Sequence, residues 1–135
     1  MSKNVTNNRE GYAHPSQNII NLFCEIVGDS NVLLDESDMQ SYLLEPRRLY
    51  SSKAACVIKP SSVLEISHLL KIANENNISV VPQGGNTGLV GGQVPYDKGN
   101  EVILSLSRLN KLREIDISTN SMTIEAGMTL DKVQK

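Results

Sequence analysis

Cysteines are scarce in this 135-residue sequence, and their placement narrows the classes of protein to which it can belong. The two cysteines, Cys24 and Cys56, lie inside separate apolar stretches and have neither C-x-x-C nor metal-ligand spacing. That placement favours buried, reduced thiols over a zinc site. A disulfide between them stays open on geometric grounds, but nothing in the sequence indicates an oxidising compartment.

The sequence also has no run of apolar residues long enough to cross a bilayer. The longest apolar stretches, such as Ile78–Val81, are far shorter than the roughly 20 residues that a transmembrane helix needs. The polar opening Met1–Glu10 lacks the apolar region of a signal peptide. The sequence therefore predicts a protein without a transmembrane segment and with a cytoplasmic address.

A large excess of either charge is missing as well. Lys and Arg number 13, Asp and Glu number 15, and both kinds are scattered along the chain. No basic face is therefore expected for nucleic acid or for an anionic membrane surface. The 39% apolar and 21% charged residues are typical of a soluble globular protein. The length suits one domain, which buries about two-thirds of the surface that the unfolded chain exposes.

The N-terminal half is expected to open with a mobile lead-in, residues 1–15, because that stretch has no apolar periodicity. Apolar residues then recur at helical spacing between Ser16, a candidate N-cap, and Gly28, a candidate C-cap. Val32–Leu34 is expected to be a short strand. Asp38–Glu45 is expected to be a helical turn that ends before a proline.

A strand, a helix and a second strand are expected next. Ala54–Ile58 is a compact apolar run, and Ser62–Glu65 has the spacing of a capping box, which places the helix start at Val63. The helix is expected to end at Asn76–Asn77, directly before a strand at Ile78–Val81. This βαβ pattern predicts two strands that are parallel neighbours. The helix residues expected to point inward are Leu64, Ile66, Leu69, Leu70 and Ala73.

The C-terminal part is rich in predicted strands, with a turn at Ser118–Asn120 between the last two. Thr129 and Leu130 have the pattern of a helix cap and first turn, and Lys135 comes too early for that helix to pack. We therefore expect an α+β chain that is truncated within its domain. The three predicted strands are Glu101–Leu106, Arg113–Ile117 and Met122–Ala126.

The segment between Gln83 and Gln93 has the most unusual composition in the chain. It contains five glycines, one Asn, one Thr and no Lys or Arg, directly after a predicted buried strand. Glycine permits positive φ angles and has no Cβ, so successive N–H groups can line a nest for oxygen anions such as a pyrophosphate. Asn86 and Thr87 can add side-chain donors. A flexible turn without a ligand has the same composition, and both interpretations stay open on composition alone.

Two known phosphate-binding motifs do not match this segment. The Rossmann fingerprint requires G-x-G-x-x-G at the start of a helix, whereas these glycines are followed by Val94–Pro95, which starts no helix. The P-loop requires a Lys and then a Ser or Thr after its last glycine. Here Gly92 is followed by Gln93 and Val94.

The segment Pro82–Gly92 instead resembles a known family. It is similar to the pyrophosphate loop of FAD-linked oxidases of the vanillyl-alcohol oxidase type, and specifically of their D-2-hydroxyglutarate and D-lactate dehydrogenase branch. The resemblance implies that residues 16–135 are the N-terminal portion of a PCMH-type FAD-binding domain, built from a helix, a βαβ unit, the glycine-rich loop and further strands. It starts near Tyr42 and continues through Val57–Ser62, Leu104–Asn110 and Glu125–Gly127 to the end of the chain.

The resemblance also implies the cofactor and its contacts. Relatives that attach flavin covalently often have a histidine directly after the paired glycines, where this chain has Asn86, so noncovalent FAD is implied. His14 and His68 receive no role, and Arg47 and Arg48 are expected to form a solvated surface pair. The residues carried over as FAD contacts are Pro82, Gln83, Gly84, Gly85, Asn86, Thr87, Gly88, Gly91 and Gly92.

The reaction implied by the resemblance is oxidation of a 2-hydroxy acid to a 2-oxo acid, with hydride transfer to FAD. No cluster of His, Arg and carboxylate is visible that would supply a base and a substrate clamp, so no catalytic or metal-binding residue is assigned. Catalysis by this chain alone is not expected. Two alternatives stay open: an inert fragment that retains no cofactor, and a nucleotide-phosphate module unrelated to flavin. Exposed strand edges and apolar faces predict self-association.

Overall fold

The computed structural model describes residues 11–50 and 52–135, and residues 1–10 of the expected lead-in lie outside that range. Its helices and mixed sheet confirm the α+β class. Among the described helices, none has the length and apolar character needed to span a bilayer. In chain order the elements are α1 (Gln17–Val27), the 3-10 helix η1 (Asp29–Asn31), β1 (Val32–Leu33), α2 (Glu36–Leu43), β2 (Cys56–Ile58), α3 (Val63–Glu75), β3 (Val80–Gln83), β4 (Val102–Ser105), β5 (Leu112–Asp116), β6 (Ser121–Ile124) and α4 (Leu130–Val133).

The main sheet has the strand order β1-β2-β4-β3, with β2, β4 and β3 parallel and β1 antiparallel to β2. The prediction that β2 and β3 are neighbours is wrong, because β4 lies between them. All of β4 is buried, whereas β3 contains the exposed Pro82. A proline has no N–H to donate to a second neighbouring strand, so β3 is expected at the edge of the sheet. Strand β4 is buried along its whole length, as expected for a central strand.

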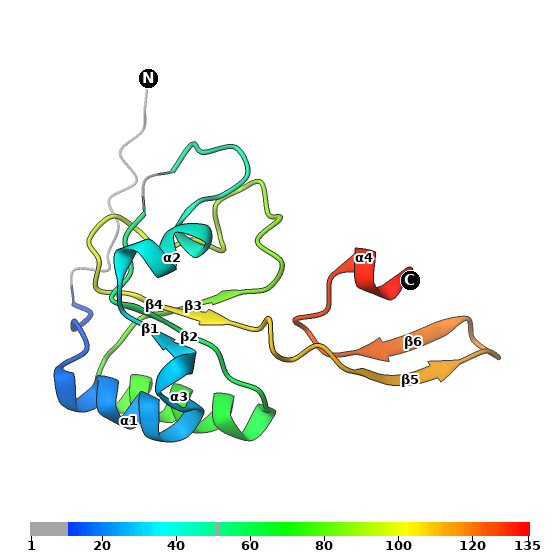
Figure 1. The fold of residues 1–135 in the computed structure, drawn as a ribbon, viewed down its shortest axis with the longest axis horizontal. Coiled ribbons are helices and arrows are strands. Elements are labelled where there is room, and N and C mark those ends of the chain that lie inside the picture. Colours follow the sequence, from blue (N-terminus) through cyan, green and yellow to red (C-terminus); the bar gives the residue numbers. More distant parts are fainter. Residues whose placement is uncertain (1–10, 51) are drawn as a thin grey trace.

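Helices cover both faces of this sheet (Figure 1). Alternate strand residues point to opposite faces, so Cys56 and Ile58 pack with α1 and α3, while Val57 packs with α2. On the neighbouring strand β4, Ile103 joins Val57 in the cluster formed with α2. The core is therefore divided into two layers, and the sheet is held between them.

The N-terminal helix α1 is capped as expected. The Ser16 hydroxyl accepts a hydrogen bond from the backbone N–H of Ile19 at 3.5 Å, and Gly28 ends the helix with φ 85°. Just before this helix, the N–H of Ala13 donates to the carbonyl of Asn77 at 2.9 Å. Residues 11–15 were expected to be part of a mobile lead-in, but this contact ties them to the end of α3.

Helix α3 starts and ends where the sequence predicts. The Ser62 hydroxyl accepts from the N–H of Glu65 at 3.1 Å, and Asn77 takes a left-handed conformation with φ 54° after the helix. Leu69 and Ala73 are buried as expected. The prediction that Leu64 and Leu70 point inward is wrong, because these residues are 65% and 44% exposed, respectively. Both lie to the side of the narrow buried stripe that faces the sheet.

Helix α2 spans Glu36–Leu43, two residues earlier at each end than the predicted turn Asp38–Glu45. It begins early because the carbonyl of Asp35 already accepts from the N–H groups of Asp38 at 3.0 Å and Met39 at 3.2 Å. It ends before Glu45 because Leu44 is already extended, with φ −100° and ψ 126°. The chain from Ser41 to Tyr50 then lies against the glycine-rich segment, which gives α2 a direct relation to the candidate site.

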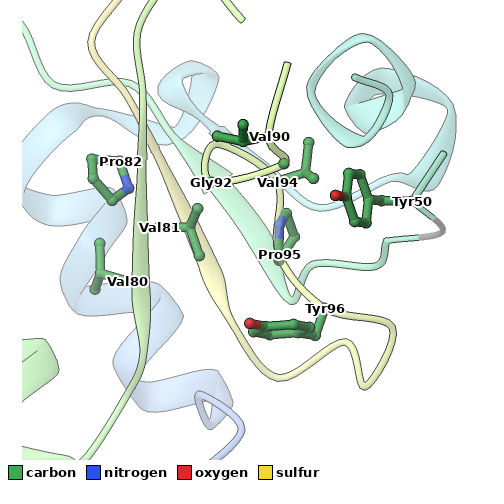
Figure 2. Close-up of a pocket in the computed structure, with 10 residues that line it drawn as sticks. Tyr50, Val80, Val81, Pro82, Val90, Gly92, Val94, Pro95 and Tyr96 are labelled. Atoms are coloured by element: carbon green, nitrogen blue, oxygen red, sulfur yellow. The ribbon is translucent and has the colours of Figure 1, made fainter. Parts of the chain in front are cut away.

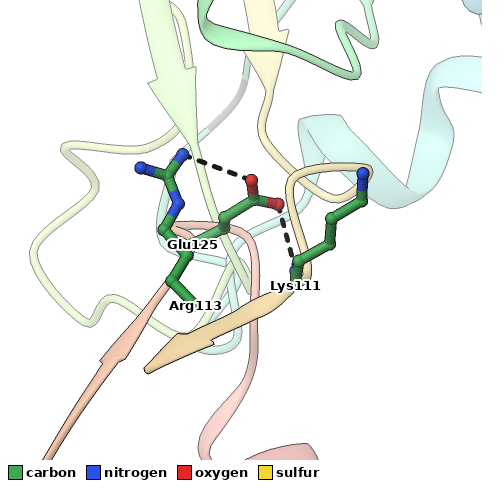
Figure 3. Close-up of polar contacts among 3 residues, drawn as sticks. All are labelled: Lys111, Arg113 and Glu125. Atoms are coloured by element: carbon green, nitrogen blue, oxygen red, sulfur yellow. Dashed lines mark hydrogen bonds and ion pairs between the residues drawn. The ribbon is translucent and has the colours of Figure 1, made fainter. Parts of the chain in front are cut away.

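Strands β5 and β6 form a separate antiparallel hairpin that extends away from the main sheet (Figure 1). The Asp116 carboxylate accepts from the N–H of Ser118 at 2.9 Å and closes the predicted turn. At the base, the Glu125 carboxylate accepts from the N–H of Lys111 at 3.0 Å and pairs with the Arg113 guanidinium at 3.3 Å (Figure 3). The predicted pair of strands and their turn are confirmed.

Candidate cofactor site

The glycine loop, residues 84–92, starts at the carboxyl end of β3. Because β2, β4 and β3 are parallel, their carboxyl ends meet at one edge of the sheet. The N–H of Leu106, just after β4, donates to the carbonyl of Gln83 at 2.8 Å, so the segments that leave β3 and β4 are adjacent. Ligands of open α/β sheets bind outside this edge. The fold therefore places the loop where a ligand is expected.

The main chain of the glycine loop has unused hydrogen-bond donors. Within the part of the chain that the structure describes, no backbone N–H from Gly84 through Gly92 donates to a protein acceptor. Gly84, Gly85 and Gly88 are exposed, so a ligand can reach them. A row of accessible N–H groups is the donor set with which glycine-rich segments bind oxygen anions.

Two side chains of the loop region point back into the protein. The Gln83 side chain is 2% exposed, and its amide donates to the carbonyls of Tyr42 and Gln93, each at 2.9 Å. The Asn86 amide donates to the carbonyls of Ser41 at 3.1 Å and Leu44 at 2.7 Å. These bonds fasten the start of the loop to the end of α2.

The far side of the loop is held by the segment that follows α2. The Arg47 guanidinium donates to the carbonyl of Leu89 at 3.4 Å. The Tyr50 ring covers Gly91, where a Cβ would lie 2.7 Å from the ring carbon Cε2 and the backbone φ is 78°. Both the left-handed conformation and the contact with the ring require glycine at this position.

Residues near the C-terminus border the loop on another side. A Cβ at Gly84 would lie 3.5 Å from the carbonyl oxygen of Ala126, an ordinary contact, and one at Gly85 would lie 3.3 Å from the Thr129 methyl group. Gly127, between these two neighbours, allows no Cβ, because it would lie 1.7 Å from the carbonyl oxygen of Leu106. The turn before α4 is thus packed closely beside the first loop glycines.

A pocket of about 300 Å³ lies beside the second half of the loop. Figure 2 shows Tyr50, Val81, Val94 and Tyr96 around it. Its size is at the lower end of the range for ligand pockets, and none of the residues 84–88 lines it. The pocket is therefore separate from the exposed N–H groups at the start of the loop.

The nine candidate FAD contacts lie in one continuous stretch of sequence, Pro82–Gly92, and the structure shows how their side chains are directed. Their side chains differ in direction, because Gln83 and Asn86 face the end of α2, while Thr87 is exposed and Pro82 lies on the edge strand. Sequence reasoning missed the supporting residues Glu45 and Tyr50. They have no motif of their own: the Tyr50 ring contacts Gly91, whereas the Glu45 carboxylate accepts from the N–H groups of Arg47 and Leu49 in the segment that carries Tyr50.

Other reactive groups do not add to this site. Both cysteines are free, and burial raises the pKa of Cys56 to about 12, with Cys24 adding to the rise. Burial likewise raises the pKa of Cys24, and Asp29 contributes. Over the described residues, no group of three or more His, Cys, Asp and Glu side chains is arranged to hold a metal ion.

Residues 54–135, more than half of the chain, match the family described as FAD binding domain. The chain belongs to this FAD-binding family. A probable D-2-hydroxyglutarate dehydrogenase, mitochondrial, of Oryza sativa subsp. indica is 38% identical over 115 residues, which cover 84% of this chain and 20% of the relative. A protein of Schizosaccharomyces pombe with the name putative D-lactate dehydrogenase, mitochondrial, is 32% identical over 127 residues, which cover 89% of this chain and 24% of the relative.

A solved structure supports the same assignment. The substrate-bound crystal structure of p-cresol methylhydroxylase matches with a TM-score of 0.74 and 26% sequence identity, covering 87% of this chain and 23% of that one. The resemblance to FAD-linked oxidases of the vanillyl-alcohol oxidase type is confirmed. This chain spans between a fifth and a quarter of the length of these relatives.

The residues present fit the pyrophosphate of FAD. The loop combines accessible N–H donors with glycines that leave room for a close approach. The Asn86 side-chain oxygen is buried and has no hydrogen-bond partner among the described residues. An amide oxygen only accepts hydrogen bonds, so this atom cannot bind a phosphate, and the pyrophosphate would depend on the main-chain N–H groups. FAD is the cofactor of this domain.

Proposed function

We propose that this chain is the FAD-binding portion of a flavin-dependent D-2-hydroxyacid dehydrogenase. The names of the two relatives, one a D-2-hydroxyglutarate and one a D-lactate dehydrogenase, support this reaction class. The structural observation that carries the proposal is the row of unused N–H donors from Gly84 through Gly92, on a loop that is held in place by other segments.

The main chain of Gly84, Gly85, Asn86, Thr87 and Gly88 would hold the pyrophosphate of FAD. Between Gln83 and Gln93 there is no Lys or Arg, so backbone dipoles rather than cations would balance the phosphate charge. The remaining candidates, Pro82, Gln83, Gly91 and Gly92, would act by shaping the loop.

When bound, FAD supplies the chemistry of the reaction by accepting a hydride from the α-carbon of the 2-hydroxy acid. The chain's own contribution is to bind and orient the cofactor without a covalent bond. Asn86, at the position where covalent relatives place a histidine, offers no ring nitrogen to the flavin. Its amide is already engaged with the carbonyls of Ser41 and Leu44.

Cofactor binding is tested with Gly84→Ala, because a Cβ at this position meets only an ordinary 3.5 Å contact with the protein, whereas on this exposed residue the added methyl group would hinder the approach of a phosphate to the main chain. We expect FAD to bind the variant of the full-length gene product about 10- to 100-fold more weakly, as expected for loss of one hydrogen bond to a charged group. Flavin fluorescence titration gives the dissociation constant.

Gly11→Ala is the matched control, because a Cβ at Gly11 meets nothing within 4 Å and the site is remote. It should bind FAD like the unaltered protein. Parental affinity in Gly84→Ala would contradict the placement of the phosphates on this loop. Gel filtration of residues 1–135 with FAD then separates two cases: flavin that elutes with the chain supports autonomous binding, and its absence supports the inert-fragment alternative.

A nucleotide-phosphate module without flavin specificity is the second candidate, because N–H donors bind any phosphate. It predicts similar affinity for ADP and FAD. The flavin proposal instead predicts tighter binding of FAD than of ADP by the full-length gene product. Competition of ADP against bound FAD measures the difference.

The substrate class is tested through the colour of the flavin. We expect D-lactate or D-2-hydroxyglutarate, added without oxygen to the FAD-loaded full-length gene product, to bleach the visible absorbance. The L-enantiomers are the controls and should leave the absorbance unchanged. If none of these acids reduces the flavin, the reaction class is wrong although cofactor binding can still hold.

Compartment and assembly are also proposals. A cytoplasmic address rests on the polar opening Met1–Glu10, whereas the rice and fission yeast relatives are mitochondrial by name. Imaging of the tagged gene product decides between the two compartments. Self-association of residues 1–135 rests on exposed apolar side chains such as Ile115 and Ile117, and a monomer in sizing experiments would contradict it.

A further inference from the structure

Glu45 is a buried carboxylate that contacts the main chain just after α2. The residue is 2% exposed. Its carboxylate accepts a hydrogen bond from the N–H of Arg47 at 2.7 Å and another from the N–H of Leu49. Buried carboxylates are uncommon because they lose hydration, and this one is compensated by two backbone donors. Its position therefore depends on the conformation of the turn that it binds.

The turn from Glu45 to Leu49 is not one that its sequence favours by itself. Arg48 has a φ angle of 51°, a left-handed backbone conformation that residues other than Gly, Asn and Asp rarely adopt. Its N–H also donates to the carbonyl of Glu45 at 3.0 Å. The carboxylate and the carbonyl of one residue thus accept three successive N–H groups and hold a strained turn in a single shape.

This turn presents two side chains to the glycine loop. The Arg47 guanidinium donates to the carbonyl of Leu89, and the Tyr50 ring covers Gly91. Neither residue belongs to the two apolar clusters of the core, and Tyr50 is 47% exposed. Loss of the turn's shape would therefore loosen the far half of the loop and leave the sheet core packed.

We propose that Glu45 is a positioning residue for FAD: its carboxylate fixes the turn at residues 45–50, and the turn holds the glycine loop in its binding conformation. The proposal rests on the proposed function, because it assumes that the loop binds FAD. A loop that is already ordered loses less conformational freedom on binding, so its affinity is higher.

The test uses Glu45→Gln in the full-length gene product. The glutamine side chain has nearly the same shape but only one acceptor oxygen, so one buried N–H loses its partner. We expect FAD to bind about tenfold more weakly, at a temperature where circular dichroism shows the variant folded. Glu25→Gln, an exposed site on α1, is the matched control and should keep the parental affinity.

A double-mutant cycle separates positioning from a general loss of stability. Arg47→Met removes the bond to Leu89 while leaving the N–H that Glu45 binds, and we expect a weakening of about threefold. If Glu45 acts through this contact, the double variant binds no more weakly than Glu45→Gln alone. Independent, multiplying effects would contradict the proposed route.

Tyr50 provides a further test that leaves the carboxylate untouched. Tyr50→Phe retains the ring over Gly91 and should bind FAD like the parent, whereas Tyr50→Leu should bind it more weakly. If Glu45→Gln does not fold, the Arg47→Met and Tyr50→Leu variants decide, and parental affinity in both overturns the proposal. If the unaltered protein itself does not bind FAD, the proposed function fails. If the unaltered protein binds FAD and Glu45→Gln binds it with the same affinity, only the positioning role fails.

Discussion

The glycine loop and the β5–β6 hairpin are stabilised in opposite ways. The hairpin has a ladder of backbone hydrogen bonds with one irregularity between Leu112 and Glu114, and apolar residues such as Ile115 and Met122 are exposed on it. The loop has no regular structure, yet side chains from its own start and from the segment after α2 fasten it at several points. Regular secondary structure and tertiary support are thus separate properties here.

This contrast has a consequence for function. In the hairpin, the main-chain N–H groups that face the partner strand are used in pairing, so those groups are unavailable to a ligand. Because the glycine loop is held through side chains of Gln83, Asn86 and Arg47, its own N–H groups remain free. Anchoring by side chains therefore lets one segment be both ordered and able to bind phosphate.

The largest effect is expected at the junction between the main sheet and the hairpin. Gly127→Ala would place a Cβ 1.7 Å from the carbonyl oxygen of Leu106, which is backbone and cannot move aside cheaply. We expect the free energy of unfolding to fall by about 3 kcal/mol. Urea denaturation followed by circular dichroism measures it, with Gly11→Ala as a near-neutral control. Equal stability of the two variants would show that the junction is not closely packed.

A smaller loss is expected within the glycine loop. Gly91→Ala introduces a Cβ at a positive φ and against the Tyr50 ring, and we expect it to cost about 2 kcal/mol. Gly92→Ala is the matched control, because a Cβ there meets nothing within 4 Å. Thermal unfolding without FAD compares the two. If both variants melt together, the contact between Tyr50 and the loop does not restrain it.

The glycine loop and the hairpin each contain an asparagine with a left-handed backbone, Asn86 and Asn120, so the contributions of the two residues to stability can be compared. Asn86→Ala loses the bonds to Ser41 and Leu44 as well as the favoured conformation, and we expect a loss of about 1 kcal/mol. Asn120→Ala, in the hairpin turn, loses the conformational preference and should cost about half as much. A larger loss at Asn120 in chemical denaturation would reverse the comparison.

Much of the fold could be predicted because its signals are local. Ser16 and Ser62 cap helices in the structure as their spacing indicates, and the turn at Ser118–Asn120 joins two strands. The strand order could not be predicted in the same way. The insertion of β4 between β2 and β3 depends on which apolar strand buries best, a comparison across the whole chain rather than within a motif.

The candidate site shows the same limit. The glycine-rich composition and its family resemblance locate the loop, because the chemistry of phosphate binding leaves a pattern in adjacent residues. The support from Glu45, Arg47 and Tyr50 comes from about 40 residues earlier and has no pattern of its own. The directions of the Gln83 and Asn86 side chains could not be predicted either, because their acceptors are backbone carbonyls at the end of α2, far away in the sequence.

The smallest effect is expected at the base of the hairpin, where Glu125 faces Lys111 and Arg113. The Lys111 N–H is the main cause that lowers the pKa of Glu125, and the Arg113 guanidinium adds to it. A lowered pKa in the folded state means that the stabilising contribution is present at neutral pH and is lost as the pH falls through the folded-state value. Unfolding near neutral pH should barely distinguish Arg113→Met from the parent, because the Arg113 side chain is 52% exposed.

An NMR titration of the Glu125 carboxyl gives the more sensitive comparison. In Arg113→Met the pKa should rise only slightly, because the Lys111 N–H, a main-chain donor, remains in place. A return of the pKa to its ordinary value would show instead that the exposed ion pair controls this carboxylate. The hairpin would then depend on side chains much as the glycine loop depends on those of Gln83, Asn86 and Arg47, and the contrast between the two regions would no longer hold.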